Sequence, residues 1–179
     1  MGRSTIVCAI CNFKMEFDIG HPQALAVAVA TRAAIETGVL KEDVLDGPLA
    51  NAKRRVAAID ALKEFQDQLE AAVEPRELMK LPDFYVLLVE SGTWGFFHAT
   101  ESGFDPDVVP ELPNVTADRQ EDRDVVLVAA KSSLQTVIKR EISADRAFSD
   151  ELFALDAGRN DSEMLRSLMS QTYPEELIH

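Results

Sequence analysis

The stretch that decides the fold is residues 84–100, which read FYVLLVESGTWGFFHAT. Residues 84–90 are rich in aromatic and branched apolar side chains, Ser91 and Gly92 can turn the chain, and residues 93–100 form a second run of the same kind. Two such runs separated by a short turn predict a β-hairpin. We therefore expect a sheet in the C-terminal half of the chain.

More strands and helices are predicted on the C-terminal side of this hairpin. Residues 104–120 contain Pro106, Pro110 and Pro113, and proline cannot donate to a ladder, so any pairing there should be short or at a sheet edge. The other expected elements are a strand at 124–130, a helix at 133–140 capped by Ser132, a short helix capped by Ser143, a strand at 151–156 and a terminal helix capped by Asp161 or Ser162.

The N-terminal side combines an alternating segment with two helices. Residues 5–19 alternate with period two and predict a hairpin that bends near Cys11. Residues 23–37 predict a helix that Gly38 ends, and this helix is apolar nearly all round, so we expect it to be buried. Residues 49–73 predict a long amphipathic helix. The two helices could also form a homodimer seam, although packing within the chain is favoured.

These elements indicate an α+β fold. It begins with a hairpin and helices, and continues with a mixed or antiparallel sheet covered by helices. Pro82 marks the expected boundary between a helical region, residues 1–80, and an α+β domain, residues 82–179. At 179 residues, the two parts could equally form one continuous domain.

The charge distribution restricts the partners. The formal net charge is −13; residues 1–80 carry 12 acidic and 10 basic side chains, and residues 81–179 carry 19 and 8. Such a field repels phosphate backbones, so no direct binding of nucleic acid is expected. Acidic excess commonly serves solubility, but it would also suit a basic protein partner.

No apolar run is long enough to span a membrane. Two cysteines and no export signal favour the cytoplasm.

No catalytic constellation is present in the sequence, so we favour a non-enzymatic role and predict no cofactor. Cys8 and Cys11 form a C-x-x-C pair, but zinc needs four ligands and no second pair exists, so these thiols are weak metal candidates. His98 would be a general base only if a carboxylate oriented it. The chain also lacks a nucleophile elbow and a phosphate loop.

Several local strings in the second half follow one another in a recognisable order: Gly92-Thr93-Trp94, the strand and helix from 124 to 140, residues 142–148 and the ELFALD run at 151–156. In this order they resemble the sterol-carrier-protein (SCP-2-like) family of lipid-binding domains, over about residues 82–173. The chain departs from the family at Asp150 and in the longer turn at 156–161. The resemblance implies a non-enzymatic domain that holds a lipid or acyl chain in an apolar pocket. The expected lining residues, which could equally just fill the core, are Phe96, Leu127, Leu134, Val137, Ile138, Phe148, Phe153, Leu165 and Met169.

The rival hypothesis comes from a different class of function. In it, the acidic C-terminal half is an interaction or inhibitory module that docks on a basic protein partner.

Overall fold

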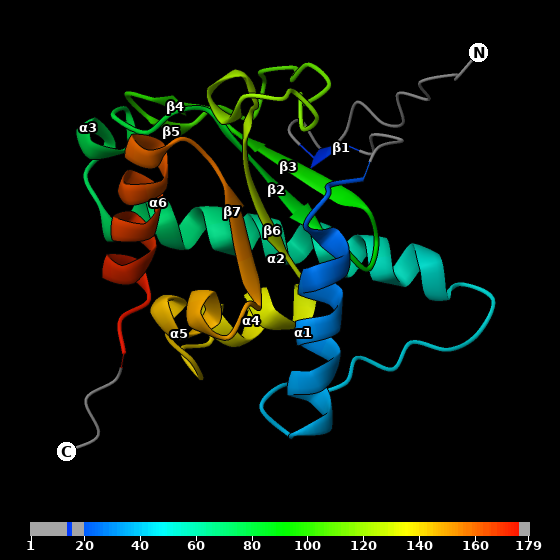
Figure 1. Cartoon of the computed structure of the whole chain (residues 1–179). Coiled ribbons are helices and arrows are strands. Elements are labelled where there is room, and N and C mark those ends of the chain that lie inside the picture. The colour runs from blue at the N-terminus through cyan, green and yellow to red at the C-terminus, as the bar shows by residue number, and fades with distance from the viewer. Residues whose placement is uncertain (1–13, 16–19, 176–179) are drawn as a thin grey trace, which may run out of the picture.

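A five-stranded mixed sheet forms the centre of the molecule (Figure 1). The structure is a computed structural model that describes residues 14–15 and 20–175. The strand order is β1-β3-β2-β6-β7; β2 and β6 run parallel, and the other neighbouring strands run antiparallel. The α+β class is thereby confirmed. The strands are β1 (Lys14–Met15), β2 (Phe84–Leu88), β3 (Thr93–Phe97), β6 (Val125–Ala129) and β7 (Phe153–Asp156).

The predicted hairpin is confirmed as β2 and β3. Leu88 lies opposite Thr93, and Gly92 turns the chain between them with a φ of +61°, a backbone region that glycine adopts without steric cost. Every position of β2, β3 and β6 is buried. Both faces of the sheet are therefore covered, which explains why these strands are continuous apolar runs and not alternating ones.

Four helices cover one face of the sheet and build the main core with it. Phe65 of the longest helix lies 5.8 Å from Phe97 of β3 and stacks at 6.2 Å on Tyr173. Residues from before and after Pro82 thus share one hydrophobic cluster. The four helices are α2 (Ala50–Ala72), α4 (Lys131–Ile138), α5 (Ala144–Ser149) and α6 (Arg159–Thr172).

The opposite face carries α1 (Ala24–Glu36) and the proline-containing segment (Figure 1). Val27 of α1 and Val115 of that segment pack with Trp94 and neighbouring strand residues in a second, smaller cluster. The expectation that α1 is buried was wrong. Leu25 is 74% and Val29 62% exposed, because only one side of the helix lies against the sheet.

Two of the three predicted caps were also wrong. Ala130, not Ser132, is the N-cap of α4, and the carboxylate of Glu90 accepts the first N–H of the helix, from Lys131, at 2.8 Å. Gly158 is the N-cap of α6, so Asp161 and Ser162 already lie inside the helix.

Ser143 caps α5 as predicted. Its Oγ accepts a hydrogen bond from the Arg146 N–H at 3.1 Å. This satisfies one of the N–H groups that a helix start leaves without an intrahelical partner.

Short elements connect the main ones. Within the proline-containing region only Gly103–Phe104 (β5) forms a strand, and it pairs with β4 (Ala99–Thr100) outside the main sheet, as expected for such a segment. Between α2 and β2 lies the single-turn helix α3 (Pro75–Leu78), and Gln120–Asp122 forms a 3₁₀ turn (η1). Of the predicted N-terminal hairpin, β1 is described; the bend near Cys11 lies outside the described residues.

Candidate functional site

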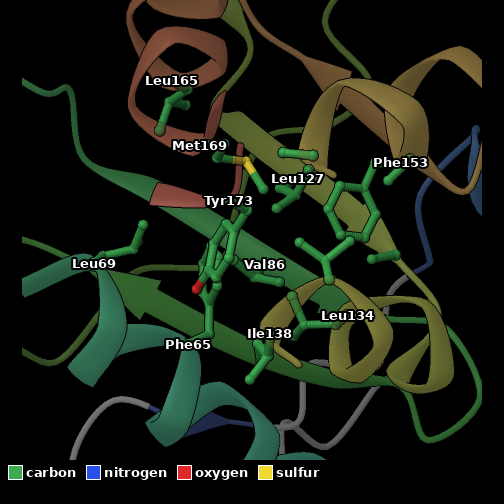
Figure 2. Close-up of a cluster of buried hydrophobic side chains, with 14 of the residues drawn as sticks. Phe65, Leu69, Val86, Leu127, Leu134, Ile138, Phe153, Leu165, Met169 and Tyr173 are labelled. Carbon is green, nitrogen blue, oxygen red and sulfur yellow. The ribbon is translucent and has the colours of Figure 1, made fainter. Parts of the chain in front are cut away.

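The structure brings eight of the nine predicted lining residues together. All except Phe96 belong to the main core cluster between the sheet and its four helices (Figure 2). Phe96 lies in the cluster on the other face, against Tyr85 at a ring distance of 4.8 Å. All nine side chains are buried, and none of them lines either of the two pockets described below.

The first pocket is a groove between α3 and α6, named here the α6 groove, with a volume of about 620 Å³. Its apolar walls are Val73, Leu81, Met164 and Leu168. Leu168 belongs to the main core cluster, and Val73 and Leu81 pack against that cluster. The polar rim consists of Glu77, Lys80, Asn160, Glu163, Ser167 and Gln171.

Helix geometry explains how the sequence makes one wall of this groove. The α6 residues that line it fall at positions 160, 163, 164, 167, 168 and 171, and residues three and four apart share one face of a helix. Leu165 and Met169 are buried in the core. One helix thus supplies both the core and the groove.

The facing wall depends on two prolines. Pro75 follows the last residues of α2 and begins α3, because proline is tolerated in the first turn of a helix but ends a preceding one. Pro82 then precedes β2. The chain between them, including Leu81, forms the wall opposite α6.

The rim of the α6 groove carries charge that is largely exposed to water. Lys80 Nζ lies 2.8 Å from Glu77 Oε1, and both side chains are more than half exposed. Pairs of this kind contribute little to stability. The apolar walls are therefore the distinctive surface of the groove.

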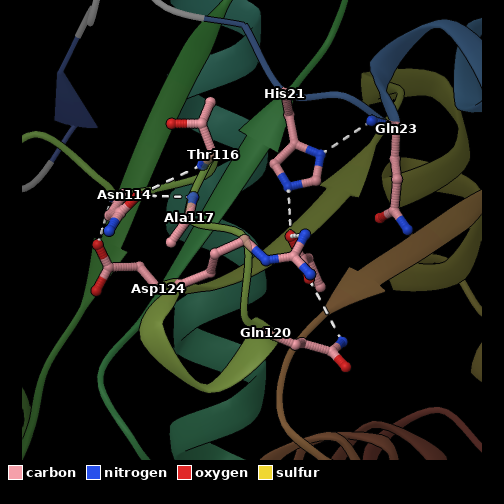
Figure 3. Close-up of polar contacts among 9 residues, drawn as sticks. His21, Gln23, Asn114, Thr116, Ala117, Gln120 and Asp124 are labelled. Atoms are coloured by element: carbon pink, nitrogen blue, oxygen red, sulfur yellow. Dashed lines mark hydrogen bonds and ion pairs between the residues drawn. The ribbon is translucent and has the colours of Figure 1, made fainter.

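A buried polar cluster joins α1 to the far edge of the sheet (Figure 3). His21 Nε2 lies 3.2 Å from Asp156 Oδ2, and Arg123 also contacts this carboxylate, at 3.1 Å. His21 Nδ1 accepts the backbone N–H of Gln23 at 3.1 Å. Because Nδ1 accepts, Nε2 carries the proton and donates to Asp156.

Burial lowers the pKa of His21 below its usual value of 6.5, although Asp156 acts in the opposite direction. The neutral ring suits the geometry, since a proton on Nδ1 would face the Gln23 N–H. Both ring nitrogens are occupied, so this histidine is not available as a base. It links the chain before α1 to β7, and Asp156 extends the link to Arg123. The sequence alone did not reveal the pairing of His21 with Asp156, because the two residues are 135 positions apart.

His98 has a carboxylate partner, which the sequence analysis set as the condition for a general base. Its Nδ1 lies 2.7 Å from Asp83 Oδ1, at the exposed end of the β2–β3 hairpin. Across the described part of the chain, no hydroxyl or thiol has a hydrogen bond to this ring. The pair resembles the orienting half of a catalytic triad without its nucleophile.

The Tyr173 hydroxyl is an unusual feature of the main core. The side chain is fully buried, and the hydroxyl has no hydrogen-bond partner among residues 14–15 and 20–175. Figure 2 shows the ring between Phe65 and Met169. Burial raises the pKa of this phenol above its usual value.

The metal hypothesis for Cys8 and Cys11 falls outside the described residues. Within the part that the structure describes, no group of three or more histidine, cysteine or acidic side chains could hold a metal ion. In that same part, no helix is long and apolar enough to cross a bilayer.

Comparison with known proteins returned no relative. No family model, no curated protein and no solved structure matches the chain. The resemblance to the SCP-2-like family therefore stays a prediction.

Proposed function

We propose that the chain binds an apolar ligand, such as an acyl chain, in the α6 groove. The observation that carries this proposal is an apolar floor within a volume of about 620 Å³, framed by polar side chains and continuous with the main core through Leu168. Small-molecule sites commonly have volumes of roughly 300–1,000 Å³, mostly apolar walls and a few polar groups.

The groove predicts how affinity should depend on ligand length. Full burial of a methylene contributes about 0.8 kcal/mol. A chain lying in an open groove buries about half of its surface, which gives about 0.4 kcal/mol per methylene. Each added methylene should then lower Kd roughly twofold.

The dependence of affinity on chain length distinguishes binding in the groove from binding inside the main core. A chain held among the eight core residues predicted from sequence would gain roughly fourfold in affinity per methylene. Binding in the main core would also bring the polar head group of the ligand within reach of the Tyr173 hydroxyl. A series of saturated fatty acids of increasing length, titrated by calorimetry, therefore distinguishes the two binding modes.

The decisive test of the groove is a variant that fills it. Ser167 is exposed on the groove face of α6, so Ser167→Phe should reduce fatty-acid affinity at least fivefold without disturbing the core. Val29→Phe, which places the same side chain on an exposed side of α1 outside both pockets, is the matched control and should bind normally. Unchanged affinity in Ser167→Phe would exclude the α6 groove as the site.

A second candidate function, docking on a basic protein partner, is favoured by the segment after β5. Val109 is 75% and Leu112 58% exposed there, and Asp107 and Glu111 lie beside them. Such a surface combines apolar anchors with negative charge. Binding to a basic partner through it should weaken with salt, and Val109→Ser should reduce that binding.

A further inference from the structure

The two parallel strands at the centre of the sheet, β2 and β6, have their carboxyl ends side by side. The chain leaves these two ends in different directions. After β2 the chain turns back through Gly92 into β3, whereas after β6 it continues into α4. It then passes through α5 and returns as β7 on the other side of β6. In open sheets, ligands bind in the crevice that such a divergence opens beyond the carboxyl ends of the strands.

A second pocket lies at this point and is named here the α1 crevice. It has a volume of about 510 Å³. Val89 and Glu90 follow β2, and Ala130 and Ser132 follow β6, so both strand ends contribute to its lining. The rest of the lining consists of Ala24, Leu25, Ala28, Thr31, Arg32 and Ile35 from α1, and Glu42 and Asp43 from the segment after it.

An exposed ion pair and a partly buried one contact the wall formed by residues 42 and 43. Arg32 donates to Glu42 Oε1 at 3.0 Å. The adjacent Asp43 pairs with Lys131, a lysine that is only 7% exposed. Because Lys131 is the first residue of α4, this wall is attached to both α1 and α4. The crevice is therefore already formed in the free protein.

The charges in the crevice favour a cation. Glu42, Asp43 and Glu90 line it, together with the cationic Arg32. The Lys131 ammonium is bound to Asp43, so three carboxylates face two cations. Arg32 is already paired with Glu36 as well as Glu42. Net charge at the site is thus negative, and so is the chain as a whole, which attracts cations and repels anions over long range.

Glu90 is the group best placed to hold that cation. Its Oε2 accepts the Lys131 N–H at 2.8 Å, whereas its Oε1 has no hydrogen bond to any residue that the structure describes. The Glu90 side chain is thus oriented by one bond and keeps a second oxygen for a ligand. Leu25, Ala28 and Ile35 supply an apolar wall beside it.

We propose that the α1 crevice binds an amphipathic cation. Its ammonium or guanidinium group bonds to Glu90, and its apolar part lies against the α1 residues Leu25, Ala28 and Ile35. This site lies at a different place from the α6 groove and takes a ligand of opposite charge to a fatty acid. The two sites can therefore be tested independently.

Three probes with the same eight-carbon chain test the charge selection. Octylammonium, octanoate and octanol, each titrated by calorimetry at pH 7, differ only in the head group. We expect octylammonium to bind at least tenfold more tightly than octanoate, with octanol between them. Higher salt should weaken octylammonium binding most. Equal affinity for octylammonium and octanoate in the Ser167→Phe variant, whose α6 groove is filled, would overturn the proposal.

Two variants locate the site. Glu90→Gln keeps an oxygen acceptor for the Lys131 N–H but removes the charge, and should weaken octylammonium binding roughly two- to fivefold. Ala28→Phe fills the crevice and should weaken octylammonium binding, while Ser167→Phe in the α6 groove serves as the control. Circular dichroism confirms folding of each variant. Normal octylammonium affinity in either Glu90→Gln or Ala28→Phe would place the cation elsewhere and refute the site.

Discussion

Replacing Tyr173 by phenylalanine should stabilise the protein. The hydroxyl is buried and has no hydrogen-bond partner in the described part of the chain, and burying a polar group without a partner costs about 1–3 kcal/mol. Phenylalanine removes that cost and keeps the ring. The stacking on Phe65 at 6.2 Å and the position of the Arg140 guanidinium, 5.9 Å from the ring centre, are preserved.

The expected gain in the free energy of unfolding is about 1 kcal/mol, the low end of that range, because removing the oxygen also leaves a small void. For a chain of this size, such a gain raises Tm by roughly 2–4 °C. Urea denaturation followed by circular dichroism measures the free energy, and calorimetry measures Tm.

Tyr85, the other tyrosine of the chain, provides the matched control. Its hydroxyl donates to the Glu111 carbonyl at 2.9 Å, and burial raises its pKa to about 12. Tyr85→Phe deletes that hydrogen bond and should lower stability by about 0.5–1.5 kcal/mol. Removing the hydroxyl should thus raise the free energy of unfolding at Tyr173 and lower it at Tyr85. Equal destabilisation in both variants would refute the reasoning, because it would mean that the Tyr173 hydroxyl is bonded.

Three further predictions concern His21, two serines and Gly103. Because burial lowers the pKa of His21, the unfolded chain binds its proton more readily; stability should fall as pH drops below 6.5, and urea midpoints should show a weaker fall in His21→Gln. Ser143→Ala removes a helix cap and should cost about 1 kcal/mol in urea denaturation, whereas Ser132→Ala, which removes no cap, should cost under about 0.5 kcal/mol. Gly103 has a φ of +116°, and a Cβ there would lie 2.8 Å from a Glu70 oxygen, so Gly103→Ala should lower Tm by several degrees through a loss of about 2 kcal/mol.

The sheet strands were predictable because they are buried on both faces and bounded by turn residues. The alternation of side chains along each strand also predicts which face of the sheet each residue points to. In the hairpin, Phe96 lies opposite Tyr85 and Phe97 opposite Phe84, and successive strand residues point to opposite sides. Phe96 could therefore have been separated from the other predicted lining residues by counting along the strand.

The exposure of α1 and the two pockets were not predictable from sequence. An apolar helix indicates that a surface is available for packing, but not how much of it another element covers. Leu25 and Val27 are equally apolar, and the structure buries only Val27. The α6 groove requires α3 and α6 to lie side by side, and the α1 crevice requires two strands far apart in sequence to be parallel neighbours. Such placements depend on tertiary packing that local periodicity does not encode.

The one-sided attachment of α1 has a consequence for how the molecule opens. Val27 and Thr31 are the buried side chains of this helix, and its start is held through His21, whereas α2 inserts five buried residues into the main core. Separating α1 from the sheet exposes far less apolar surface than global unfolding does. Partial opening should therefore begin at this helix, which uncovers Trp94 and the second cluster before the main core is disturbed.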